Sequence, residues 1–283
     1  MKSVDIEISS VCNLKCINCA YNSEDNIDKQ FMKIEVFTNI LKKIKKMNNL
    51  VYIHLVGLGE ATLHPKFIDF FELIKDLKSK GVNIGITTNG TNILKYVDVL
   101  NKFDTITISF DAASAEVFDK CRPGYNFSKL VENVKKLTNK KKRFSFIINN
   151  YNFKEIEAFV ELSKKLGATD VYYEFANEPW IKKNNRHYDK TNIKLIIDKL
   201  KKSNDLNIVL KDSPVSGVCN YFDNVLKFNQ DGTTSICPFI NKKILFEDII
   251  LSRKALTEDI ENLKYSECKQ CNHFSIMNNG TKC

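Results

Sequence analysis

The sequence has no run of about eighteen consecutive apolar residues, which argues against a helix that spans a membrane. Its first residues, Met-Lys-Ser-Val-Asp, contain no apolar signal-peptide core and lead at once into an expected strand. There is no internal repeat beyond strand–helix units, and no low-complexity linker. These absences predict a cytoplasmic protein with no membrane partner.

The net charge of +9 comes from lysines scattered along the chain. A nucleic-acid-binding protein is one interpretation of this charge. However, the lysines fall on the outer faces and ends of expected helices, where they would be solvated. We therefore expect no nucleic-acid partner.

Nine cysteines in such a chain are unusual, because disulfides do not persist in a reducing compartment. Cysteines there indicate metal or redox chemistry. Three lie between residues 12 and 19, five lie beyond residue 218, and Cys121 stands alone between the two groups.

Short runs rich in Val, Ile, Tyr and Phe alternate with amphipathic stretches, which predicts βαβ units and a parallel sheet. The expected strands are 3–9, 51–57, 82–88, 105–111, 143–149 and 171–176. The expected helices are 33–47, 66–80, 91–101, 114–141 with a break at Pro123-Gly124, 153–166 and 190–202. Periodicity alone leaves open whether the sheet is doubly wound or a partial barrel.

The pattern changes after about residue 203. Residues 225–239 read as a hairpin that turns at Asn229-Gln230-Asp231-Gly232, and a cysteine-bearing tail follows. We expect residues 1–202 to form the α/β domain and residues 203–283 a smaller unit that needs a metal to fold.

The first cysteine group, Cys12, Cys16 and Cys19, follows the first strand with spacings of four and three positions. Three thiolates this close can bind three corners of a [4Fe–4S] cube, and no fourth cysteine or histidine lies nearby to close the last iron. A zinc knuckle that borrows a distant cysteine is the alternative. The spacing and its position after the first strand resemble the radical S-adenosylmethionine superfamily.

Further residues at strand ends match that family, and the resemblance covers residues 4 to about 175. Leu58-Gly59-Glu60-Ala61 resembles its Gly-Gly-Glu-Pro motif but departs from it at the first and last positions. By this resemblance the cofactor-binding residues are Gly59, Glu60, Thr88, Asn89, Ser109, Asp111, Arg122 and Asn149. Arg122 is expected to pair with the carboxylate of S-adenosylmethionine. The implied fold is a partial, TIM-like (β/α)6 barrel.

The resemblance also implies the chemistry. One electron from the cluster, delivered by a flavodoxin- or ferredoxin-type donor, would cleave S-adenosylmethionine to methionine and a 5′-deoxyadenosyl radical. That radical would take a hydrogen atom from a substrate.

The later cysteines resemble the auxiliary-cluster modules called SPASM and, in shortened form, twitch. The cysteines that a full SPASM module carries soon after Cys271 are missing, so the resemblance implies the twitch form, a small α+β domain with one further [4Fe–4S] cluster. Its implied ligands are Cys219, Cys237, Cys268 and Cys271, with Cys283 as a possible replacement. Zinc would use the same thiolates. Covalent haem is excluded because no histidine follows Cys271 directly.

Cys121 has two interpretations. It is either a small buried residue beside Arg122, which is commoner, or a thiol that returns a hydrogen atom to a substrate radical. The leading functional prediction is oxidation of a substrate C–H bond, with the auxiliary cluster as electron acceptor.

The resemblance implies either a sugar or aminocyclitol substrate or a peptide. Because the first expected strand begins at residue 3, we expect no peptide-recognition domain before it. This expectation favours a small carbohydrate-like substrate or a peptide delivered by a separate protein. Three alternatives stay open. One is a radical epimerase or peptide maturase with a thiol donor. The second is a relative of the enzyme that rebuilds GTP toward molybdopterin. The third is a zinc or iron–sulfur module that senses redox state.

Overall fold

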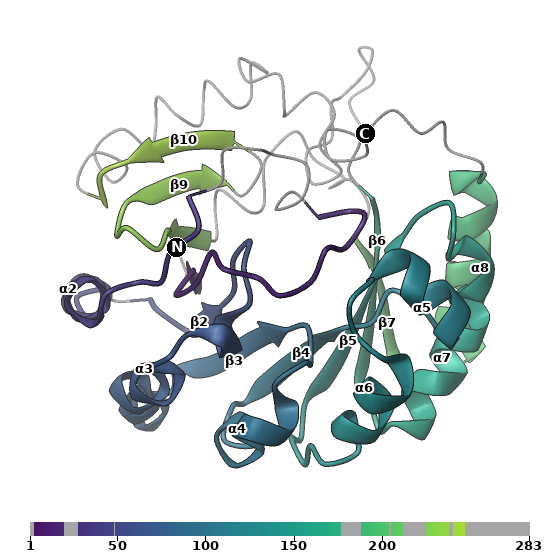
Figure 1. Cartoon of the computed structure of the whole chain (residues 1–283), viewed down its shortest axis with the longest axis horizontal. Helices are drawn as coiled ribbons and strands as arrows, with labels where there is room; N and C mark the ends of the chain where they lie inside the picture. The colour runs from purple at the N-terminus through teal and green to yellow at the C-terminus, as the bar shows by residue number, and fades with distance from the viewer. Residues whose placement is uncertain are drawn as a thin grey trace.

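One curved sheet organises the chain (Figure 1). The computed structural model describes residues 3–19, 28–47, 49–176, 188–203, 205–211, 225–237 and 240–246. The sheet has the strand order β10-β9-β8-β1-β2-β3-β4-β5-β6-β7. The strands are β1 (Ser3–Ile6), β2 (Tyr52–Leu55), β3 (Asn83–Thr88), β4 (Thr105–Ser109), β5 (Lys142–Ile148), β6 (Asp170–Phe175), β7 (Asn207–Lys211), β8 (Val225–Phe228), β9 (Thr234–Cys237) and β10 (Ile240–Ile244).

Helices connect the parallel strands. Figure 1 shows α2, α3, α4, α6, α7 and α8 along the outer side of the sheet. The α-helices are α2 (Ile34–Ile44), α3 (Phe67–Ile74), α4 (Ile93–Leu100), α5 (Ala115–Cys121), α6 (Phe127–Val134), α7 (Ile156–Lys165) and α8 (Lys190–Ser203). Short 3-10 helices are η1 (Ala61–Leu63), η2 (Lys75–Lys80) and η3 (Phe153–Glu155).

The predicted alternation of six strands and six helical segments is confirmed, and the sheet from β1 to β7 is parallel throughout. The α/β fold is thus of the partial-barrel type. Strand β7 was not predicted. It lies beyond residue 202 and pairs in parallel with β6, so the α/β sheet does not end with the sixth helix.

The predicted hairpin is also confirmed: β8 and β9 are antiparallel. Its turn places Gly232 at a φ of 86°, a conformation that glycine adopts without the strain of a Cβ. The sequence did not predict that β8 also pairs in parallel with β1. Through this pairing a strand more than 200 residues away in the chain becomes a neighbour of the first strand.

The second half of the expected helix 114–141 differs from the prediction. The break at Pro123-Gly124 is present, and α6 ends at Val134 instead of continuing to residue 141. The Asn139 side chain donates hydrogen bonds to the carbonyl groups of Leu100 and Phe103, which ties this segment to the end of α4. The chain therefore leaves the helix early in order to enter β5.

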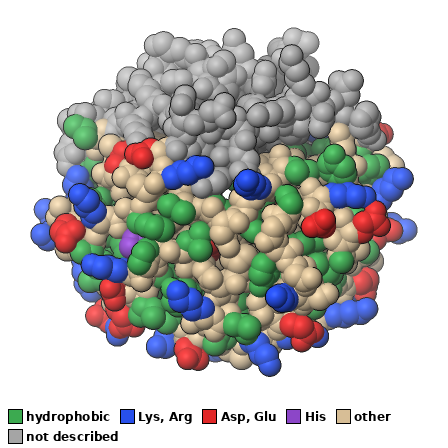
Figure 2. Space-filling model, in the orientation of Figure 1, with side chains coloured by type: hydrophobic (Ala, Val, Ile, Leu, Met, Phe, Trp, Pro, Cys, Tyr) green, Lys and Arg blue, Asp and Glu red, His purple; other side chains and the backbone are tan. Residues whose placement is uncertain are grey.

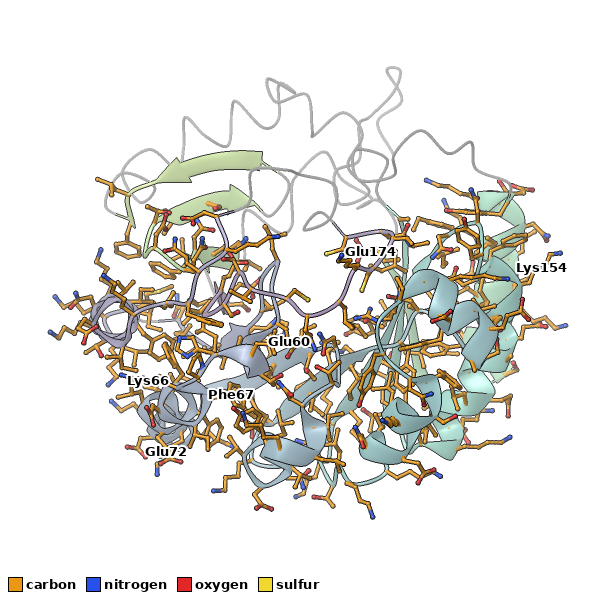
Figure 3. The ribbon with its side chains drawn as sticks, in the orientation of Figure 1. Glu60, Lys66, Phe67, Glu72, Lys154 and Glu174 are labelled. Atoms are coloured by element: carbon orange, nitrogen blue, oxygen red, sulfur yellow. The ribbon has the colours of Figure 1, made fainter. Side chains whose placement is uncertain are left out.

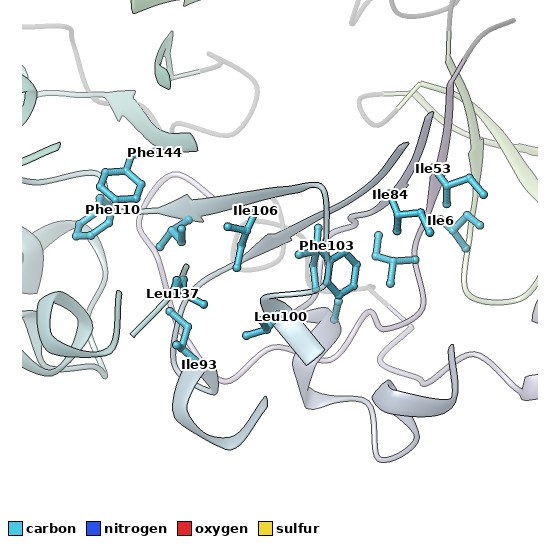
Figure 4. Packing of buried hydrophobic residues seen from close by; sticks show 14 of the residues in the cluster. Ile6, Ile53, Ile84, Ile93, Leu100, Phe103, Ile106, Phe110, Leu137 and Phe144 are labelled. Atoms are coloured by element: carbon cyan, nitrogen blue, oxygen red, sulfur yellow. The ribbon is translucent and has the colours of Figure 1, made fainter. Parts of the chain in front are cut away.

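The core lies between the sheet and the outer helices. Figure 4 shows isoleucines of β1 to β4 in the same hydrophobic cluster as side chains of α4 and of the segments that follow α4 and α6. Val4 and Ile6 of β1 are fully buried on this face, and β2 follows with Ile53 and Leu55. Each such side chain contributes about 1.5–3 kcal/mol when it is fully buried. Because strand residues alternate, the intervening positions face the concave side of the sheet.

The described surface gives no sign of a single basic face in the view of Figure 2, where basic and acidic side chains are interspersed. Five described lysines form ion pairs with a carboxylate three or four residues away, such as Lys120 with Glu116 and Lys164 with Glu161. No helix in the described part of the chain is long and apolar enough to cross a membrane.

Candidate active site

The loop that bears the first three cysteines follows β1 across the carboxyl edge of the sheet. Backbone hydrogen bonds hold it at both ends: Ser10 pairs with Gln30, and the amide of Ile17 donates to the carbonyl of Cys121 at 3.1 Å. Leu14, between the cysteines, is buried. The loop is thus fixed by contacts with segments far from it in the chain.

Gly59 allows this loop to approach the turn after β2. A Cβ at this position would lie 2.4 Å from the carbonyl oxygen of Ser9 and 2.6 Å from that of Val11. The amide of Glu60 donates to the same Val11 oxygen at 2.8 Å. A side chain at residue 59 would therefore push the cysteine loop away, because backbone atoms cannot yield as a flexible side chain can.

Cys12, Cys16 and Cys19 line one cavity of about 290 Å³. Burial raises the pKa of Cys12 and Cys16 above the ordinary thiol value. The positive charge of the Arg122 guanidinium acts in the opposite direction and partly offsets the effect of burial on both pKa values. Buried thiolates need positive partners, and Arg122 is one of them.

The donor set fits an iron–sulfur cube. Among the described residues, no three His, Cys, Asp or Glu side chains are gathered so that they could hold a single metal ion. A [4Fe–4S] cube does not require this, because each cysteine binds a different iron. The three thiols would bind three irons from one side of the cavity.

The residues predicted to bind the cofactor come together around the same cavity. All except Arg122, which follows α5, lie at or just beyond the carboxyl ends of successive parallel strands, which is where α/β proteins bind ligands. Those that line the cavity are Gly59, Glu60, Thr88, Asn89, Ser109, Asp111 and Arg122. Asn149, the eighth, is buried behind it and does not line it.

Glu60 joins two of these strand ends (Figure 3). Its buried carboxylate accepts hydrogen bonds from the hydroxyl and amide of Thr62, the Thr88 hydroxyl at 2.8 Å and the Asn89 amide at 2.6 Å. Four donors on one carboxylate leave it little capacity for a ligand. Glu60 therefore positions the loops after β2 and β3.

Asn89 connects β3 to the cysteine loop. Its side-chain amide donates to the Asn13 side chain at 2.9 Å and lies 3.9 Å from the Cys12 sulfur. Its oxygen accepts from the amide and hydroxyl of Thr91. These bonds fix the amide orientation beside the first cysteine.

Asp111 and Arg122 form a buried ion pair at the opposite wall. Arg122 Nη1 lies 2.6 Å from Asp111 Oδ2, and Oδ1 of Asp111 accepts from the Ile147 amide at 2.7 Å. Asp111 has a φ of 58°, the left-handed conformation that an Asp tolerates better than most residues. Both oxygens of this carboxylate thus have protein partners, which suits a role in orienting Arg122 more than direct contact with a cofactor.

Arg122 keeps part of its binding capacity. Its Nε is buried and has no hydrogen-bond partner among the described residues. Burial lowers the pKa of Arg122, but Cys16 and Asp111 raise it by more, so the guanidinium stays charged. A fixed cation with an unused donor next to the cysteines can bind a carboxylate.

Cys121 is both buried beside Arg122 and part of the cavity wall. Its sulfur exchanges weak hydrogen bonds with the Asn149 side-chain amide at 3.5 and 3.8 Å. Burial raises the pKa of Cys121 to about 12, so at neutral pH it is a thiol that carries its hydrogen. Both interpretations of this residue agree with its position.

The predicted auxiliary ligands Cys219, Cys268, Cys271 and Cys283 lie outside the described residues. The backbone of Cys237 ends β9, whereas its side chain is not described. The auxiliary cluster stays a prediction.

Three charged residues near the cavity were missed by the sequence reasoning. Asp5 and Lys227 line the cavity, and Glu7 lies just behind it with its carboxylate on the Leu58 amide. A signal was present: Asp5 and Glu7 alternate with Val4, Ile6 and Ile8, which predicts that the charged side chains face the inside of a barrel.

A cavity at the carboxyl edge of a partial barrel, with three cysteines from the loop after β1, defines a class of iron–sulfur enzyme. The family model of the radical SAM superfamily matches residues 6–163, more than half of the chain. The chain belongs to this superfamily, whose members bind a [4Fe–4S] cluster and S-adenosylmethionine.

Curated relatives match only part of the chain. A probable GTP 3',8-cyclase of Saccharolobus islandicus is 28% identical over 178 residues, which are 61% of this chain and 56% of that protein. A tungsten-containing aldehyde ferredoxin oxidoreductase cofactor-modifying protein of Pyrococcus furiosus is 36% identical over 91 residues, 32% of this chain and 24% of that protein. The match to the cyclase thus spans little more than half of its length.

Solved structures share the fold. Streptococcus suis SuiB bound to S-adenosylmethionine superposes with a TM-score of 0.73 at 18% identity, covering 95% of this chain and 70% of SuiB. The enzyme anSMEcpe with bound S-adenosylmethionine gives a TM-score of 0.70 at 18% identity, covering 96% and 87%. At this identity the likeness shows the fold alone.

Proposed function

We propose that this radical SAM enzyme removes a hydrogen atom from an unactivated C–H bond of its substrate and oxidises the resulting radical. The observation that carries the proposal is the convergence of Cys12, Cys16 and Cys19 with the loop of Gly59 and the buried cation Arg122 on one cavity. When bound, the cluster and S-adenosylmethionine supply the carbon radical that abstracts the hydrogen atom.

The chain's own residues would bind and orient these groups. The three cysteines ligate the cluster, and Arg122, held by Asp111, pairs with the carboxylate of S-adenosylmethionine. The backbone around Gly59 faces the cavity, and Glu60 holds that turn against β3. Positioning is the protein's main contribution to such chemistry.

The electron that leaves in an oxidation needs an acceptor. We assign this role to an auxiliary [4Fe–4S] cluster on Cys219, Cys237, Cys268 and Cys271, with Cys283 as a possible replacement; the cysteine spacing supports it. Reconstituted protein should then contain close to eight irons, two cubes of four. About four irons with one zinc would instead assign a zinc site to the tail.

A second function, epimerisation, has one specific observation in its favour. The Cys121 thiol lines the cavity and is protonated, as a hydrogen-atom donor must be. Oxidation uses no such donor and returns no hydrogen to the carbon.

Heavy water separates the two functions. Oxidation leaves no solvent deuterium at the attacked carbon, whereas a thiol donor places one deuterium there because S–H exchanges with solvent. Deuterium that appears with wild-type protein and is lost in Cys121→Ala would overturn oxidation in favour of epimerisation. Cleavage of S-adenosylmethionine, assayed anaerobically, separates both from a metal-binding sensor.

The substrate is either a small carbohydrate-like molecule or a peptide. The structural neighbours include SuiB bound to its precursor peptide SuiA, which supports the second class. The cyclase relatives support a small molecule in the partial barrel.

A further inference from the structure

The cavity continues from the cysteines into the concave side of the sheet, where Asp5 of β1, Thr87 of β3 and Lys227 of β8 form its inner end. Asp5 is the register partner of Lys227 on one side and of His54 on the other. Neighbouring strands lie about 4.8 Å apart, so the Asp5 and Lys227 side chains stand next to each other on the same face.

Lys227 is the unusual member of this group. It is 6% exposed, and its Nζ lies 3.8 Å from Glu7 Oε2, beyond hydrogen-bond distance. The other oxygen of Glu7 accepts from the Leu58 amide. Among the described residues, none offers Nζ an acceptor at hydrogen-bond distance.

An ammonium group has three N–H donors, and those of Lys227 have an ion-pair partner in Glu7 but no described protein acceptor at hydrogen-bond distance. Lys227 borders the cavity, so a bound molecule is the natural source of acceptors. A second unused group lies on the same face: the Thr107 hydroxyl is buried without a partner among the described residues, and Thr107 is the register partner of Thr87.

The charges around Lys227 decide which acceptor fits. Among the described side chains, two carboxylates, those of Glu7 and Asp5, flank this ammonium. An anionic ligand would therefore meet a surplus of negative charge. A neutral hydroxyl group accepts from the ammonium and donates to a carboxylate, and so satisfies both.

Thr87 completes the lining. Its hydroxyl lies 2.9 Å from Nε2 of His54, whose Nδ1 is 3.6 Å from Asp5 Oδ1. This chain of contacts fixes the Thr87 and Asp5 side chains at the cavity wall. A few fixed polar groups of this kind give a ligand site its specificity.

We propose that the inner end of the cavity binds two adjacent hydroxyl groups of a polyhydroxylated substrate. Lys227 donates to the oxygen of one hydroxyl, and Asp5 accepts from its neighbour. This inference rests on the proposed function and chooses between its two substrate classes: it selects the small carbohydrate-like molecule over the peptide.

The test is calorimetric titration of the anaerobically reconstituted protein, with S-adenosylmethionine present, against four probes. These are myo-inositol, cyclohexanol, inorganic phosphate and glycylglycine. Wild-type protein should bind myo-inositol and not cyclohexanol, which lacks adjacent hydroxyls. Lys227→Met and the isosteric Asp5→Asn should each weaken myo-inositol binding by about tenfold or more, as expected for hydrogen bonds to charged groups.

Lys142→Met is the matched control. Lys142 is also partly buried, but its ammonium binds the carbonyl groups of Leu137 and Leu166 outside the cavity. This variant should bind myo-inositol as wild type does. Circular dichroism of each variant shows whether it has folded, and Asp5→Asn decides the question if Lys227→Met does not fold.

Three results would overturn the inference: no myo-inositol binding to wild type, unchanged binding in both cavity variants, or preferred binding of phosphate or glycylglycine. Its failure is distinguishable from that of the proposed function, because cleavage of S-adenosylmethionine is measured separately. Cleavage without polyol recognition removes only the inference, whereas absence of cleavage by wild type removes the proposed function.

Discussion

Replacing Arg122 by methionine is the most informative change at the cofactor wall. Arg122 and Asp111 are both buried, and their charged atoms are 2.6 Å apart. At an effective dielectric constant of about 20 their gross attraction is roughly 6 kcal/mol, most of which offsets the cost of burying both charges. Arg122→Met leaves Asp111 buried and unpaired, so the free energy of unfolding should fall by about 3–5 kcal/mol.

The same substitution should weaken S-adenosylmethionine binding. A charge-assisted contact to a carboxylate contributes about 1.5–3 kcal/mol, which corresponds to a roughly ten- to 150-fold increase in Kd. Asp111→Asn should give a smaller loss, because the guanidinium remains but loses its orientation. The double variant Asp111→Asn/Arg122→Met should regain part of the lost stability and none of the lost affinity.

The assay combines equilibrium binding of S-adenosylmethionine to anaerobically reconstituted protein with urea unfolding of each variant. Lys120→Met, two residues earlier in α5 and exposed, is the control and should change neither quantity measurably. Wild-type affinity in folded Arg122→Met would refute the assignment of this arginine to the cofactor.

Three further predictions follow from single residues. Gly59→Ala should reduce the iron content of reconstituted protein, since its Cβ would collide with the backbone of the cysteine loop; retention of full iron would show that the loop can yield. The Cys121 pKa of about 12 predicts that iodoacetamide spares this thiol in folded protein up to about pH 9, by mass spectrometry, and rapid labelling at pH 7.5 would contradict its burial. Burial lowers the pKa of His64, whose Nδ1 accepts a hydrogen bond from the Lys66 amide. The stabilisation that neutral His64 gives the folded protein is therefore present above pH 6.5, the ordinary pKa of histidine, and is lost as the pH falls below that value. When the pH is lowered from 7.5 to 5.5, the urea concentration at the midpoint of unfolding should therefore decrease more in wild type than in His64→Leu.

The sequence predicted the parallel part of the fold well because its strands and helices have clear periodicities. The runs that form β3 to β6 are continuous and rich in β-branched or aromatic residues, since their apolar faces pack under helices. Strand β7 was missed because Asn207–Lys211 is short and follows a lysine-rich helix. The parallel pairing of β8 with β1 joins distant segments, which no local pattern reveals.

For the site, motif spacing identified the residues at the strand ends but not what each one contacts. Glu60 and Asp111 were predicted among the cofactor-binding residues, and the structure adds that both carboxylates accept hydrogen bonds from protein donors. Such partners depend on which loops meet in space, and periodicity does not contain that information. The same holds for Lys227, whose place in the cavity follows from the β1–β8 pairing.

The central claim is that Cys12, Cys16 and Cys19 hold the cluster that cleaves S-adenosylmethionine. The most direct measurement is 5′-deoxyadenosine formation by reconstituted wild type and by the triple variant Cys12→Ala/Cys16→Ala/Cys19→Ala, with all later cysteines intact. Wild type should form the product in the presence of a strong reductant, and the variant should form none while it loses about half of its iron. Undiminished 5′-deoxyadenosine formation by the triple variant would contradict the claim.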